Sequence, residues 1–127
     1  PGAGVFMRLG YAVDLFGELE WLKELPCYYW GDLDTHGFAI LNRLRYYLPH
    51  ARSLLMDEAT LLAHQGFWGQ EDSPADSAEL SLLTNEELRL YGDLCNNRWG
   101  ARLRLEQERI PWEYAWERLC AVRDSQE

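Results

Sequence analysis

Asp32 and Asp34 are the residues of this chain whose type and spacing most clearly predict chemistry. They follow a short aromatic run, Cys27 to Trp30, which is entered through Pro26 and which we predict to be a buried strand. Side chains two positions apart on an extended chain share a face, so both carboxylates should lie at the carboxyl end of this strand. Ligands of open α/β sheets bind at such ends, and the pair therefore predicts a cation or phosphate site.

The chemistry of Mg²⁺ explains why these residues should be aspartates. This ion prefers near-octahedral oxygen ligands and keeps several waters, so protein sites usually supply only one or two carboxylates. We therefore expect Asp32 and Asp34 to hold Mg²⁺ or Mn²⁺. The alternative is structural: Asp34 or Thr35 caps a helix, and Asp32 is only solvated.

Two neighbouring residues are candidate contacts for a phosphate group. Gly37 would let the phosphate approach the backbone, and a helix that begins between Thr35 and Gly37 would direct unpaired N–H groups towards it. His36 could contact phosphate or transfer a proton. A hydrogen bond from His36 to a neighbouring carboxylate is an equal alternative.

The segment from Tyr29 to Phe38 resembles a known motif. Its Asp-x-Asp-x-x-Gly element, Asp32 to Gly37, is similar to that of Toprim domains, the Mg²⁺-dependent folds of topoisomerases, primases and related nucleases. With Leu55-Met56-Asp57 and the block from Arg104 to Ile110, it resembles the carboxyl-terminal domain of the JetD family. JetD is the nuclease subunit of bacterial Wadjet anti-plasmid systems, and its Toprim domain is similar to that of the topoisomerase VI A subunit.

The resemblance implies an α/β, Toprim-like fold, in which a mostly parallel central sheet is flanked by helices in three layers. It also implies a Mg²⁺-dependent DNA endonuclease of the bacterial cytoplasm. Such an enzyme would act with other subunits of an SMC-like defence complex, and a homodimer is one possible assembly. Toprim catalysis implies a further glutamate on an earlier strand, and no acidic residue precedes Asp14. We therefore expect residues 1–127 to be a single Toprim-like domain that lacks its first strand and its upstream DNA-binding domains, and that is inactive alone.

The segment from Leu103 to Ile110 is the second candidate for function. Its leucines alternate with charged residues as in a strand, so Glu106 and Glu108 should share a face. The functional interpretation makes them catalytic, with one near the metal or its waters, and the resemblance supports it. The structural interpretation pairs them with neighbouring arginines in contacts that contribute less than about 1 kcal/mol. Arg109 is a candidate phosphate contact, because guanidinium pairs with phosphate in a planar way.

Asp57 closes a third predicted strand, Ser53 to Met56, as the aspartate pair closes the second. If the two strands are parallel neighbours, Asp57 would lie beside the pair. The preferred alternative is that Asp57 caps a short helix from Glu58 to His64 and accepts a hydrogen bond from the N–H of Thr60.

The remaining pattern predicts an alternation of strands and helices. We expect a strand at Val5 to Met7 and a helix at Val13 to Leu25. The next helix should carry an apolar stripe of Phe38, Leu41, Leu44 and Leu48, with Arg43 and Arg45 outside this stripe. Two more helices should follow, one after a capping box at Thr84 and the last after Pro111.

Composition sets limits on the function. The 127 residues, 47% of them apolar, suffice for one core, and the absence of an apolar run of about 18 residues or of a leader favours the cytoplasm. Three cysteines predict reduced thiols rather than a disulfide framework. The net charge of −9 argues against DNA binding by this chain alone, although a nuclease can take its basic channel from other domains.

Two other function classes compete with a nuclease. Phosphatases of the haloacid dehalogenase type also carry an aspartate pair at a strand end, but their pattern places threonine or valine where this chain has His36. A non-catalytic protein-interaction domain would use its acidic surface to bind a partner, and its aspartates would only cap a helix. Metal titration separates these classes, because only a Toprim site should bind Mg²⁺ or Mn²⁺ through both aspartates.

Overall fold

The computed structural model describes residues 4–7, 23–75 and 79–125, and three of its strands form a parallel sheet. The strand order is β1 (Gly4–Met7), β2 (Cys27–Trp30) and β3 (Arg52–Ser53). All four side chains of β2 are buried, as expected for a central strand covered on both faces. The predicted strands at Val5 to Met7 and Cys27 to Trp30 are confirmed.

Four α-helices and a small two-stranded antiparallel sheet complete the described part of the chain. The helices are α1 (Thr35–Tyr47), α2 (Glu58–Ala63), α3 (Asn85–Cys95) and α4 (Trp112–Ser125). Strands β4 (Gly69–Gln70) and β5 (Leu103–Arg104) pair antiparallel, and short 3-10 turns η3 (Gln65–Phe67) and η4 (Gln107–Arg109) lie beside them. None of the helices described is long and apolar enough to cross a membrane.

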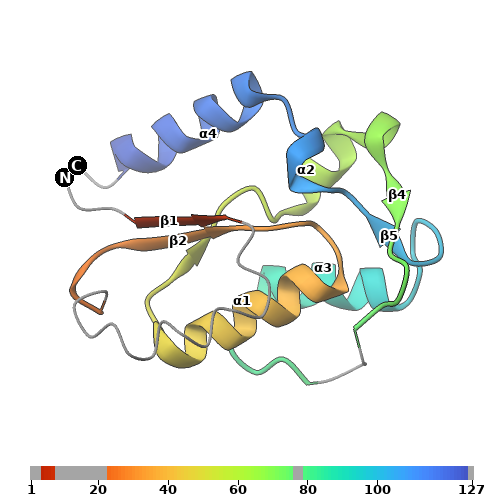
Figure 1. Cartoon of the computed structure of the whole chain (residues 1–127), viewed down its shortest axis with the longest axis horizontal. Coiled ribbons are helices and arrows are strands. Elements are labelled where there is room, and N and C mark those ends of the chain that lie inside the picture. Colours follow the sequence, from red (N-terminus) through yellow and green to blue (C-terminus); the bar gives the residue numbers. More distant parts are fainter. Residues whose placement is uncertain (1–3, 8–22, 76–78, 126–127) are drawn as a thin grey trace.

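Helix α1 contributes side chains to the core and begins directly after Asp34. Its apolar stripe is confirmed, because Phe38, Leu41 and Leu44 are completely buried, and so is Leu48 just beyond its end. Figure 1 shows α1 and α3 on one side of strands β1 and β2 and α4 on the other. The α/β class and the parallel strands are therefore as predicted, whereas the specifically Toprim-like, three-layer arrangement stays a prediction.

Two predicted strands are shorter in the structure. Strand β3 ends at Ser53 rather than Met56, because Leu55 has a φ of 60°, which interrupts an extended chain. Asp57 then caps α2 by accepting a hydrogen bond from Thr60 N at 2.8 Å. The preferred interpretation of Asp57 as a helix cap is therefore confirmed, and the alternative position beside the aspartate pair is not.

The second correction concerns the segment after Leu103. Only Leu103–Arg104 is a strand, and the chain turns at η4, so Glu106 and Glu108 do not share a strand face. Elsewhere, the capping box at Thr84 and the helix after Pro111 are confirmed. Most of the predicted helix at 13–25 lies outside the described residues.

The segment after β5 is joined to the loop between β2 and α1. Leu33 and Leu105 exchange two backbone hydrogen bonds, of 2.9 and 3.1 Å. Both leucines are completely buried. The loop that carries Asp32 and Asp34 is thus held between the parallel sheet, the start of α1 and the segment that follows β5.

Candidate functional site

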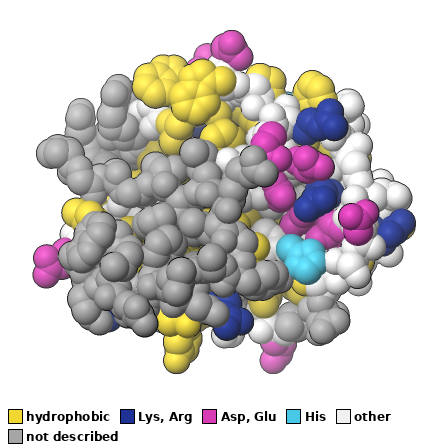
Figure 2. All heavy atoms as spheres, in the orientation of Figure 1, with side chains coloured by type: hydrophobic (Ala, Val, Ile, Leu, Met, Phe, Trp, Pro, Cys, Tyr) yellow, Lys and Arg dark blue, Asp and Glu magenta, His cyan; other side chains and the backbone are white. Residues whose placement is uncertain are grey.

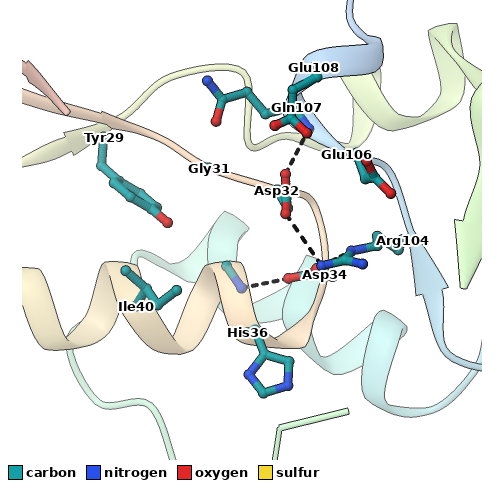
Figure 3. A pocket seen from close by; sticks show the side chains of 11 residues that line it. Tyr29, Gly31, Asp32, Asp34, His36, Ile40, Arg104, Glu106, Gln107 and Glu108 are labelled. Atoms are coloured by element: carbon teal, nitrogen blue, oxygen red, sulfur yellow. Dashed lines mark hydrogen bonds and ion pairs between the residues drawn. The ribbon is translucent and has the colours of Figure 1, made fainter. Parts of the chain in front are cut away.

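Asp32 and Asp34 lie on either side of Leu33 in the sequence, and both line the same pocket. This pocket, of about 390 Å³, is also lined by His36, Arg104 and two glutamates, Glu106 and Glu108. Figure 3 shows these side chains around the end of β2 and the start of α1. The structure therefore brings together Asp32, Asp34, Glu106 and Glu108 but not Asp57, and Glu106 and Glu108 come from a turn rather than a strand.

Asp34 is the N-cap residue of α1. Its Oδ1 accepts from Gly37 N at 2.6 Å, and the residue is only 1% exposed. Burial raises the pKa of Asp34 to about 6, with nearby Glu71 and Asp32 adding to the rise, against the Gly37 N–H and Arg104, which lower it. Asp34 therefore carries its negative charge only because the fold supplies donors and a cation.

Asp32 is held by a different part of the chain. Its Oδ1 accepts from Gln107 N at 2.8 Å, at the start of η4. Its side chain remains 29% exposed on the pocket side. Asp32 is thus oriented by a backbone donor and is not merely solvated.

Arg104 lies between the two carboxylates. Its Nε donates to Asp34 Oδ2 at 3.0 Å, and a terminal guanidinium nitrogen lies 3.6 Å from Asp32 Oδ2. Burial lowers the pKa of Arg104, but Asp34, Asp32 and Glu106 outweigh it, so the pKa lies above its usual value. One of the two interpretations of the glutamates pairs them with neighbouring arginines, but the ion pairs of Arg104 in the structure are with the aspartates.

The N–H groups at the start of α1 already have partners within the chain. Gly37 N donates to Asp34, and His36 N donates to Glu71 Oε1 at 3.3 Å. A Cβ on Gly37 would lie 1.9 Å from the carbonyl oxygen of Asp32, so glycine is required here for packing of the chain itself. The anion expected at this helix end is therefore supplied by the protein's own carboxylates.

The other two candidate phosphate contacts lie at the edges of the site. The His36 ring lines the pocket, and its Nε2 forms a 2.6 Å hydrogen bond with the carbonyl of Ser73. Arg109 lines an adjoining pocket of about 150 Å³, which shares Arg104 and Glu106 with the first. Whether either side chain binds phosphate stays a prediction.

Glu71 is a buried acid of this site that the sequence analysis missed. It is 2% exposed, and both of its carboxylate oxygens accept from Thr35 Oγ1 at 2.9 Å. It follows β4, so it connects the two-stranded β4–β5 sheet to the first residue of α1. No local pattern relates Glu71 to the aspartate pair, which lies more than 35 residues earlier.

The donor set suits a cation. The Oδ2 atoms of Asp32 and Asp34 already face one positive group, the Arg104 guanidinium, and two carboxylates are what protein sites usually offer to Mg²⁺. In the part of the chain that the structure covers, no three acidic, histidine or cysteine side chains lie close enough together to form a metal-binding group. A metal here would thus take two ligands from this arrangement and complete its shell with water or substrate.

Comparison with known proteins assigns a family. The family model described as "Wadjet protein JetD, C-terminal" matches residues 1–119. The match includes the aspartate pair, Glu71 and the segment that carries Arg104. No curated protein sequence matches the chain.

Proposed function

Because the chain belongs to the family of JetD C-terminal domains, we propose that it is the metal-dependent DNA-cleaving domain of a bacterial Wadjet anti-plasmid system. One observation carries this proposal. At the carboxyl end of the central strand, the carboxylates of Asp32 and Asp34 both contact one positive group, the Arg104 guanidinium. The Asp-x-Asp-x-x-Gly spacing, which Toprim domains share, supports the same function.

Asp32 and Asp34 would hold Mg²⁺ or Mn²⁺ through the carboxylate oxygens that now face Arg104. When bound, such an ion polarises a scissile phosphate and lowers the pKa of an attacking water. The chain keeps both carboxylates in place, because the Gly37 N–H holds Asp34 and the Gln107 N–H holds Asp32. Ligands fixed in this way need little rearrangement when the ion arrives.

Glu106 and Glu108 line the same pocket and are the proposed partners of the reacting water. A carboxylate there can accept a proton or orient metal-bound water. His36 and Arg109 would contact the phosphate from the edges, since the Gly37 N–H already donates to Asp34. DNA would reach this acidic domain through the full-length protein, its homodimer or the other subunits of the complex.

One observation favours the rival, a non-catalytic acidic interaction domain. Both oxygens of Asp34 already have partners in the chain, as expected for a residue that only caps a helix and forms an ion pair. In this rival, Mg²⁺ would have no effect on the domain. The two functions therefore make different predictions, because only the nuclease needs the two carboxylates for DNA cutting.

Nicking of supercoiled plasmid by the full-length protein with its partner subunits tests the proposal. Asp32→Asn and Asp34→Asn should each abolish Mg²⁺-dependent cutting, because an amide binds the ion far more weakly than a carboxylate. Asp93→Asn is the matched control, because Asp93 pairs with Arg98 and does not line the pocket. Undiminished cutting by Asp32→Asn would overturn the nuclease assignment.

A further inference from the structure

Arg104 lies where a metal ion would be expected to sit. Its guanidinium contacts the Oδ2 atoms of both Asp32 and Asp34, the pair proposed to be the metal ligands. Figure 3 shows the guanidinium between the two carboxylates. The carboxylate oxygens that face away from it, both Oδ1, are bound to backbone N–H groups.

The burial of Asp34 explains why this position needs a cation. The Asp34 side chain is 1% exposed, with Asp32 and the buried Glu71 close enough to repel its charge. A buried carboxylate among other carboxylates is costly unless a positive group compensates for it. Among the residues that the structure describes, Arg104 is the cation that contacts Asp34.

We propose that Arg104 is the resident cation of the metal-free site, and that its guanidinium and a divalent ion compete for the Oδ2 atoms of Asp32 and Asp34. The inference rests on the proposed metal-dependent function. Two positive groups on the same pair of oxygens repel each other strongly in a site that is partly shielded from water. Entry of the divalent ion therefore drives the guanidinium away from the carboxylates.

The fold offers the displaced side chain a second position. Arg104 borders both the main pocket and the adjoining pocket of about 150 Å³. Glu106 borders both pockets too, so a carboxylate is available on that side. The side chain is 32% exposed, so its movement does not require the core to open.

Mn²⁺ calorimetry on the chain tests the competition at mildly alkaline pH. Arg104→Gln should bind Mn²⁺ roughly tenfold more tightly than the parent, because the competing charge is gone. Arg102→Gln is the matched control, because Arg102 directly precedes the strand β5 that carries Arg104. Arg102 contacts Gln70 and the Asp72 carbonyl rather than the aspartate pair, so this variant should bind Mn²⁺ as the parent does.

The outcomes separate this inference from the proposed function. If the parent binds Mn²⁺ and Arg104→Gln binds it equally or more weakly, the competition is wrong. Weaker binding by the variant would show instead that Arg104 prepares the carboxylates for the ion. If neither protein binds Mn²⁺, the proposed metal site fails and the competition fails with it.

A second measurement avoids the chance that Arg104→Gln unfolds. In the unchanged protein, the Arg104 Nε–H is bonded to Asp34, so saturating Mg²⁺ should speed its hydrogen exchange with water in NMR spectra. The Arg45 Nε–H is the internal control, because it donates to the Ala51 carbonyl at 2.9 Å far from the site. Unchanged exchange at Arg104 in saturating Mg²⁺ would overturn the proposal.

Discussion

The two oxygens of Asp34 have different partners, which allows one residue to be both a helix cap and a metal ligand. Oδ1 accepts from Gly37 N, and Oδ2 faces the Arg104 guanidinium. The cap fixes the side chain, whereas the second oxygen is available to a cation. Capping and metal binding, which the sequence presents as alternatives, are therefore compatible at this residue.

The raised pKa of Asp34 predicts a specific dependence of stability on pH. Between the usual Asp value and about 6, the folded protein binds this proton more firmly than the unfolded chain, so stability decreases as pH rises. The rise of the pKa from its usual value to about 6 corresponds to roughly 3 kcal/mol. Asp34→Asn cannot ionise, so its stability relative to the parent should increase by about that amount between about pH 4 and pH 7.

Urea denaturation of both proteins without metal, repeated across this pH range, measures the effect. At neutral pH, Asp34→Asn should be as stable as the parent or more so. A difference between the two proteins that stays constant with pH would contradict the raised pKa. A loss above about 2 kcal/mol at neutral pH would show that capping dominates, since that is the upper range for a lost cap.

Gly37 gives a second prediction at the scale of a single residue. Gly37→Ala would place a methyl group 1.9 Å from the Asp32 carbonyl oxygen, so the backbone that carries Asp32 must move. We expect a loss of about 1–3 kcal/mol in unfolding free energy, as for other overpacked sites. Gly92→Ala is the control within α3, where a Cβ would meet nothing within 4 Å. That variant should gain roughly 0.5–1 kcal/mol from helix propensity.

Equal stability changes for the two alanine variants in urea denaturation would show that Gly37 is not required for close packing. Loss of stability at Gly37 should also be accompanied by weaker Mn²⁺ binding, because the Asp32 carboxylate would shift with its backbone.

At the scale of elements, a buried ion pair joins α1 to α3. Arg45 forms a bidentate pair with Glu87, and its Nε donates to the Ala51 carbonyl. Burial raises the pKa of Glu87, but the hydrogen bonds from Arg45, Ser53 and Thr84 outweigh it, so the pKa lies below its usual value. Glu87 also closes the capping box of α3. The pair thus fixes α3 against the helix that presents Asp34.

Arg45→Met should lower the unfolding free energy by about 3–5 kcal/mol, because it leaves the Glu87 carboxylate buried without its cation. Arg43→Met, an exposed arginine on the same helix, is the matched control and should cost far less. The double change Arg45→Met with Glu87→Gln should recover part of the loss. Denaturation in urea at neutral pH gives all three values, and equal losses for Arg45→Met and Arg43→Met would contradict a structural role for the pair.

The elements that the sequence predicts well are those with local signals. An aromatic run after Pro26 predicts β2, and Thr84 with Glu87 predicts the start of α3. The pairing of Arg104 with Asp34 spans 70 residues, and that of Asp32 with Gln107 N spans 75, so no local pattern encodes them. The burial of Arg45 has the same origin, because its partner Glu87 lies 42 residues away.

For the whole molecule, the acidity of the surface is the property that limits function. In the view of Figure 2, several Asp and Glu side chains gather on the right, with basic side chains among them. The net charge of −9 would repel DNA at long range. A positive partner surface would attract this face, so the acidity is compatible with a domain that acts inside a larger complex.

Residues 1–127 alone should therefore neither bind nor cut DNA. Fluorescence anisotropy with a labelled duplex should show no binding at physiological salt, because affinity for DNA comes mainly from Lys and Arg contacts to phosphate. Plasmid should stay supercoiled in Mg²⁺ or Mn²⁺, whereas the full-length protein with its partner subunits should cut it. Aspartate-dependent cutting by the isolated chain would contradict this, and would require Glu106 or Glu108 to complete the site. Asp57 could not, because it lines a separate pocket with Ser53 and Glu87 and not the pocket of the aspartate pair.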